Sequence, residues 1–159
     1  MFKLFLISSF ILTTLSTFVS ADVNSVDIKQ TENVMVLNYD GFFDRMDDLN
    51  EAEYNQIKLA FYLKNSQGQP CEINQVKLRT KRKSMDVYFI ENTGELLLPF
   101  EPKFDQDKAA IIINKKTKTE CGLDMRLESS VLLNKTVSVE QALSLIQSLD
   151  AALDDLAGM

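Results

Sequence analysis

The strongest chemical signal in the sequence is a run of basic side chains in an otherwise acidic chain. The sequence has 159 residues and a formal net charge of -6. The basic residues of the run are Lys77, Arg79, Lys81, Arg82 and Lys83. Successive side chains of a strand point to opposite faces, so an extended segment here would align alternate cations on one face. We interpret this run as a candidate binding face for an anionic partner; the alternative is that lysines protect an edge strand from pairing with another chain.

A second cluster, of carboxylates, has a different interpretation. Its members are Asp40, Asp44, Asp47 and Asp48. A calcium loop needs oxygen ligands at alternate positions, and Phe42 and Phe43 break that spacing. Helical spacing instead places the carboxylates opposite the apolar side chains. We therefore expect a solvated helix face, with no metal and no cofactor.

Histidine is absent, and the sequence has only two cysteines. Lack of histidine excludes Ser-His-Asp and Cys-His catalysis and histidine-ligated zinc. Cys71 and Cys121 lie about 50 residues apart, without the C-x-x-C spacing of redox pairs. In an exported chain an even number of cysteines predicts a disulfide, and two free buried thiols are the alternative.

The first 21 residues have the pattern of a secretory signal peptide. Lys3 precedes an apolar run from Leu4 to Val19, and Val19-Ser20-Ala21 is a small-residue cleavage site. The run is shorter than the roughly 20 apolar residues that span a bilayer. We predict that residues 1–21 are removed and that residues 22–159 form a single domain without a transmembrane span. The alternative is an uncleaved anchor.

Elements that could position these residues follow from the apolar periodicity. Strands are expected at residues 34–39, 57–64, 72–80, 85–91, 95–100, 109–114 and 121–127. A helical segment is expected near 42–55, and a capping-box pattern at Ser138 and Gln141 begins an amphipathic helix at about 139–156. We expect that helix to dock on the domain's own sheet through Val139, Ile146, Leu149, Leu153 and Leu156; the alternative is that it pairs with the same helix of a second copy. The predicted class is α+β, with an antiparallel sheet or sandwich of five to seven strands.

Three segments carry a resemblance to a known family. They are the segments LNYDGFFDRM at 37–46, IKLAFYL at 57–63 and ELLLPF at 95–100. Over roughly residues 34–130, including both cysteines, the chain resembles a family of uncharacterised exported proteins of Gram-negative bacteria, classed as a domain of unknown function. The resemblance implies a periplasmic location and assigns no activity.

The sequence favours binding over catalysis. The acidic net charge argues against nucleic acid as a partner. We expect a non-catalytic interaction or envelope-associated binding module, whose partner is an envelope protein or an anionic envelope component. The alternative is a periplasmic hydrolase or a carrier of a small apolar ligand on the same sheet.

Overall fold

A computed structural model describes residues 28–131 and 136–158. Its strands are β1 (Ile28–Gln30), β2 (Val34–Asn38), β3 (Ile57–Lys64), β4 (Ile73–Arg79), β5 (Ser84–Ile90), β6 (Glu95–Leu97), β7 (Ala110–Lys115) and β8 (Gly122–Ser129). Its helices are α1 (Asp40–Asp48), the 3₁₀ turn η1 (Ala52–Tyr54), α2 (Pro102–Gln106) and α3 (Val139–Ala157).

The strands form one antiparallel sheet in the order β1-β2-β7-β4-β5-β6-β3-β8. The predicted α+β class is confirmed. Seven strands correspond to the apolar segments of the sequence, and the three-residue β1 is added by pairing with β2. The predicted helical segment near 42–55 is present as two pieces, α1 and η1.

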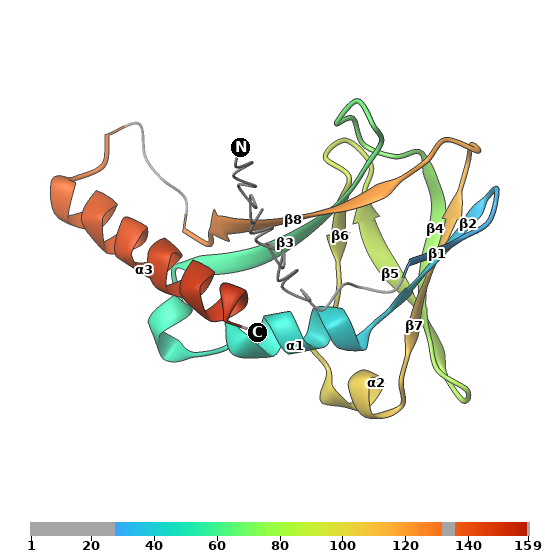
Figure 1. Ribbon diagram of the computed structural model, residues 1–159, viewed down its shortest axis with the longest axis horizontal. Coiled ribbons are helices and arrows are strands. Elements are labelled where there is room, and N and C mark those ends of the chain that lie inside the picture. Colours follow the sequence, from blue (N-terminus) through green and yellow to red (C-terminus); the bar gives the residue numbers. More distant parts are fainter. Residues whose placement is uncertain (1–27, 132–135, 159) are drawn as a thin grey trace, which may run out of the picture.

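The sheet curls around its apolar face, and α1 and α2 close one end of it (Figure 1). Alternation with a period of two explains which residues face inward. In β7, Ile111 and Ile113 are fully buried, and Val76 and Leu78 of β4 lie on the same side. Phe42 of α1 completes this core by packing edge to face on Phe61, with ring centroids 4.9 Å apart.

The short loop between the predicted strands 85–91 and 95–100 joins β5 and β6 in a hairpin. Gly94 has a φ of +82°, and a Cβ there would lie 2.8 Å from the carbonyl oxygen of Leu63. Glycine is required at this position because the neighbouring strand passes too close for a side chain. Cys71 and Cys121 are bonded to each other, as predicted, and join the segments before β4 and β8.

The C-terminal helix begins at the predicted capping box, in which Ser138 and Gln141 exchange hydrogen bonds. The predicted docking face is only partly right. Leu149 packs on the domain together with Leu145 and Ala152, whereas Val139, Ile146 and Leu153 of the predicted face are exposed.

The face of α3 that packs on the domain differs from the predicted face for a physical reason. Apolar residues occupy about half of the helix circumference, so hydrophobic spacing alone does not fix which part docks. The small side chain of Ala152 is fully buried, which lets α3 approach the surface of Tyr54 and Ile57 closely. The hydroxyl of Tyr54 also donates to Asp155 Oδ2 and so orients the last turns.

The predicted signal peptide, residues 1–21, lies outside the described residues. Within the described ranges, none of the helices has the length and apolarity needed to cross a membrane.

Candidate binding cleft

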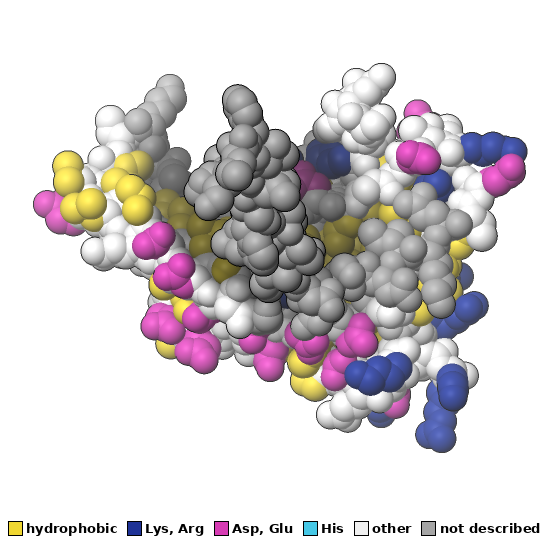
Figure 2. All heavy atoms as spheres, in the orientation of Figure 1, with side chains coloured by type: hydrophobic (Ala, Val, Ile, Leu, Met, Phe, Trp, Pro, Cys, Tyr) yellow, Lys and Arg dark blue, Asp and Glu magenta, His cyan; other side chains and the backbone are white. Residues whose placement is uncertain are grey.

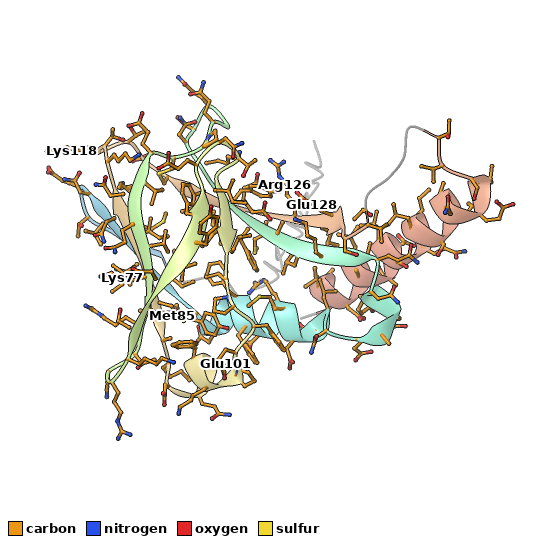
Figure 3. All side chains as sticks on the ribbon, turned by 180° about the vertical axis from the view of Figure 1, so that it is seen from behind. Lys77, Met85, Glu101, Lys118, Arg126 and Glu128 are labelled. Atoms are coloured by element: carbon orange, nitrogen blue, oxygen red, sulfur yellow. A yellow bond between two sulfur atoms is a disulfide. The ribbon has the colours of Figure 1, made fainter. Side chains whose placement is uncertain are left out.

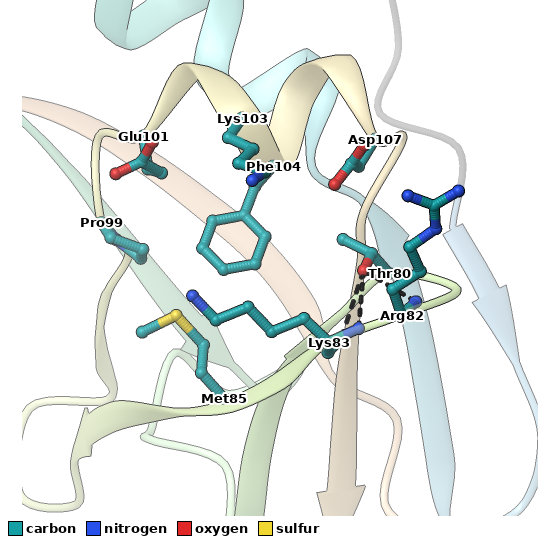
Figure 4. A pocket seen from close by; sticks show the side chains of 9 residues that line it. All are labelled: Thr80, Arg82, Lys83, Met85, Pro99, Glu101, Lys103, Phe104 and Asp107. Carbon is teal, nitrogen blue, oxygen red and sulfur yellow. Dashed lines mark hydrogen bonds between the residues drawn. The ribbon is translucent and has the colours of Figure 1, made fainter.

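The β4–β5 hairpin tip forms one wall of a cleft beside α2. Thr80 organises this tip: its backbone N–H donates to the carbonyl of Lys83 over 2.8 Å. Its hydroxyl accepts the N–H groups of Arg82 (3.2 Å) and Lys83 (3.0 Å). Threonine hydroxyls commonly stabilise tight turns in this way. The turn fixes the backbone from which Lys83 extends into the cleft (Figure 4).

The opposite wall is the segment from Pro99 into α2, and Tyr39 anchors it. The Tyr39 hydroxyl donates to the carbonyl of Pro99 and accepts the N–H of Glu101 over 3.1 Å. Tyr39 is completely buried at the start of α1. Burial raises the pKa of its phenol, which therefore keeps the proton it donates.

Aromatic contacts add to this anchor. Phe100 stacks on Phe43 of α1, with ring centroids 4.9 Å apart. Tyr39 meets Phe104 of α2 edge to face at 6.1 Å. Such pairs contribute about 0.5–1.5 kcal/mol each beyond the area they bury. The wall is thus held to the core from both ends of the 99–104 segment.

The cleft between the two walls has a volume of about 540 Å³. Its lining residues are Thr80, Arg82, Lys83, Met85, Pro99, Glu101, Lys103, Phe104 and Asp107. The Lys83 side chain runs across the cleft towards Met85, beside the Phe104 ring (Figure 4). Its Nζ lies 5.4 Å from the Phe104 centroid, within reach of a cation–π interaction. One ammonium group is therefore held over an apolar floor.

Three cations and two carboxylates line the cleft, so it carries one net positive charge in a chain of net charge -6. Within the described part of the chain, Arg82, Lys83 and Lys103 form no salt bridge. A cation–π contact leaves the N–H donors of Lys83 able to meet an anion. The arrangement can bind a negatively charged group whose neighbouring atoms are apolar.

The five residues of the predicted basic face do not lie together in the structure. Lys77 and Arg79 lie on the outer face of β4, opposite Asp86 and Ser84 of β5. Figure 3 shows Lys77 away from the interior, while Met85 and Glu101 face the same space beside α2. Lys81 is exposed at the hairpin tip. Of the five predicted residues, the cleft brings together only Arg82 and Lys83.

The residues that α2 and β5 add to the cleft were not predicted from the sequence. Lys103 stands alone between Pro102 and Phe104, without a run of like residues to signal a site. Phe104 and Met85 have the pattern of ordinary core side chains. Only the pairing of β4 with β5 and the position of α2 make them neighbours of Lys83.

A second basic segment, after β7, provides a contrast because its cations have partners. Lys115 is buried and its Nζ donates to the carbonyl of Thr119 over 3.0 Å. Lys116 forms a salt bridge of 3.2 Å with Glu91, and Lys118 forms one with Glu32. Two of the three cations of this segment are therefore neutralised locally by carboxylates.

The aspartate cluster lies on α1, near α2. Lys108 Nζ lies 3.6 Å from Asp105 Oδ1 and 4.0 Å from Asp40 Oδ2. Burial, followed by the charge of Asp105, raises the pKa of the Asp44 carboxyl. Within the described residues, no group of acidic, cysteine or histidine side chains is arranged to hold a metal ion.

Comparison with known proteins identifies a family. The model of a family described as "Protein of unknown function (DUF2987)" matches residues 31–159. No curated protein and no solved structure shows a significant match. The chain belongs to this family, and the resemblance to a domain of unknown function is confirmed.

Proposed function

We propose that this member of the DUF2987 family is a non-catalytic binding module of the bacterial envelope that takes an anionic ligand with an apolar portion. The ligand would place its anionic group near Lys83 and its apolar portion against Met85, Pro99 and Phe104. The observation that carries the proposal is the Lys83 ammonium over Phe104, without a carboxylate partner in the described part of the chain.

The size and chemistry of the cleft support this ligand class. Its volume lies within the range of about 300–1,000 Å³ that is common for small-molecule sites. Arg82 and Lys103 add two cations at the cleft, while the carboxylates of Glu101 and Asp107 limit how much negative charge a ligand can carry. A ligand with one anionic group suits this balance better than a polyanion, which would meet both carboxylates.

The lining residues favour binding over hydrolysis. Thr80 contributes the hydroxyl of the cleft, and that hydroxyl accepts two backbone N–H groups of the turn. A nucleophilic hydroxyl needs an adjacent general base. Thr80 instead has a structural partner in its own turn.

Location in the periplasm is part of the proposal. It is supported by the signal-peptide pattern of residues 1–21 and by the Cys71–Cys121 disulfide, since disulfides persist in oxidising compartments. Cell fractionation with intact-mass analysis tests it: a periplasmic form that begins at Asp22 is expected. A full-length product in the membrane fraction would contradict it.

Calorimetric titration tests the ligand class with three probes: octyl phosphate below its micelle concentration, octanol and inorganic phosphate. Octyl phosphate should bind most tightly because it alone offers both an anion and an apolar chain. Lys83→Met should raise the Kd for octyl phosphate about tenfold, since a charge-assisted hydrogen bond is lost.

Lys81→Met is the matched control, because it removes the same charge from the same hairpin but not from the cleft. Its Kd should stay within about twofold of the wild-type value. Equal affinity of Lys83→Met and the wild-type protein would refute the site. Equal binding of inorganic phosphate and octyl phosphate would refute the apolar part of the proposal.

A further inference from the structure

The outward side of α3 carries an apolar ridge that the domain does not cover. We call Val139, Leu143, Ile146 and Leu153 the α3 ridge; they are 70%, 53%, 61% and 56% exposed. Their spacing of four, three and seven residues keeps them on one side of the helix. Leu145, Leu149 and Ala152 occupy the adjoining side and pack on the domain. The ridge is thus separate from the docking face of α3.

The spacing of the ridge matches that of helices which bind partners through apolar anchors. Anchors at i, i+4 and i+7 are the pattern by which an amphipathic helix packs in a groove or along a second helix. In Figure 2 apolar side chains gather at the amino-terminal end of α3, away from the rest of the domain. The ridge is therefore accessible to a partner.

The charge of α3 indicates which kind of partner could cover the ridge. The helix contains Glu140, Asp150, Asp154 and Asp155 and has no lysine or arginine. At 100° per residue, Asp150 lies in line with the ridge, and Glu140 and Asp154 flank it on the side away from the docking face. Acidic side chains are also visible along the neighbouring surface of α1 and α3 in Figure 2.

This charge makes a second copy of α3 an unfavourable partner for the ridge. Pairing two identical ridges would bring like charges together, and each copy would bury Asp150 without a cation of the other helix to meet it. An anionic membrane surface is disfavoured for the same reason. A helix with lysine or arginine beside its apolar residues would satisfy both the ridge and its flank.

We propose that the α3 ridge binds a basic amphipathic helical segment of another protein. The apolar side chains of that segment would cover Leu143 and Ile146, and its cations would meet Glu140, Asp150 and Asp154. This surface is independent of the binding cleft, because no residue of α3 lines that cleft.

The test uses the full mature chain and two 18-residue helical peptides with leucines at heptad a and d positions. One peptide carries lysine at the e and g positions, and the other carries glutamate there. The lysine peptide should bind at least about tenfold more tightly, and Ile146→Ser should weaken its binding about tenfold. Ala151→Ser, on the exposed polar side of α3, is the matched control and should leave the affinity within about twofold.

Circular dichroism should show that both variants keep the wild-type fold, because both positions are exposed. Equal binding of the two peptides, or no binding of the lysine peptide, would overturn the proposal. Two further results would also overturn it, because they identify a different occupant. One is a dimer in light scattering that Ile146→Ser dissociates, and the other is binding to phosphatidylglycerol vesicles that Ile146→Ser abolishes.

Discussion

The binding cleft and the α3 ridge differ in how the chain treats charge and apolar surface. In the cleft, Lys83 extends over the Phe104 ring between two fixed walls. On the ridge, Leu143 and Ile146 project from a helix that carries only acidic charge. We propose that the first region recognises an anion next to apolar atoms and that the second recognises an apolar strip next to cations.

The two basic segments differ in whether their cations have carboxylate partners. Lys116 and Lys118 carry the same charge as the hairpin cations, but each has a carboxylate partner. Lys83 has an aromatic partner instead. A net charge of -6 therefore does not prevent a local site for an anion, because the acidic side chains of this chain are not distributed evenly.

The largest expected effect comes from removing the disulfide, which stabilises the domain that carries both regions. Changing Cys71 and Cys121 together to alanine should lower the free energy of unfolding by about 4 kcal/mol, because the bridge closes a loop with a sequence separation of 50. Urea denaturation of the oxidised wild-type protein and the double variant measures it. A difference below about 1 kcal/mol would show that the bridge constrains the unfolded chain far less than its loop length implies.

The next effect separates the two sides of α3. Leu149→Ala should destabilise the protein by about 2 kcal/mol because Leu149 packs against the Tyr54–Ile57 cluster. Leu143→Ala should change stability by less than about 0.5 kcal/mol, since Leu143 belongs to the exposed ridge. Thermal unfolding of both variants gives the comparison. Equal losses would mean that the ridge is also docked.

Tyr39→Phe tests whether the Tyr39 hydroxyl holds the cleft wall in place. The variant leaves the carbonyl of Pro99 and the N–H of Glu101 without the Tyr39 hydroxyl, at an expected cost of about 1.5 kcal/mol. Octyl phosphate binding should weaken as well, because this hydroxyl positions the wall. Tyr88→Phe, at a residue that is 72% exposed, is the control and should be nearly neutral. Weakened stability without weakened binding would separate the anchor from the cleft.

The smallest effect is a dependence on alkaline pH. Burial and the hydrogen bond to Glu128 Oε1 raise the pKa of Tyr62 from 10.0 to about 12. The neutral phenol is the form that the folded state favours, so its contribution is complete below pH 10 and is lost as pH rises from 10 towards 12. Denaturation midpoints measured across this range should fall less steeply in Tyr62→Phe. An unchanged slope would contradict the role of Tyr62.

Much of the fold follows from periodicity in the sequence. The apolar residues of segments such as 57–64 and 110–115 predict strands, but they do not by themselves show which face is buried. Residues 60–63 are buried on both faces of β3, and Lys115 is buried at the end of β7. The capping box at Ser138 marks the start of α3 because its side-chain bonds are local. The docking face of α3 was predicted only in part, because it depends on the burial of Ala152 and on the hydrogen bond from Tyr54 to Asp155. Neither is visible in the hydrophobic pattern.

The candidate site was less accessible to sequence reasoning. Arg82 and Lys83 stand out as part of a basic run, but the hairpin turn at Thr80 separates them from Lys77 and Arg79. Lys103 and Phe104 come from a short helix 20 residues further along the chain. Long-range packing through Tyr39 places that helix, and a local pattern carries no information about such packing.

An NMR titration of the mature, isotope-labelled protein with octyl phosphate tests the central claim most directly. Binding in the cleft should shift the amide signals of residues 80–85 and 100–107 and leave those of α3 unchanged. Lys83→Met should abolish these shifts at ligand concentrations that saturate Lys81→Met. Shifts concentrated on α3, or shifts in the cleft that persist unchanged in Lys83→Met, would contradict the account.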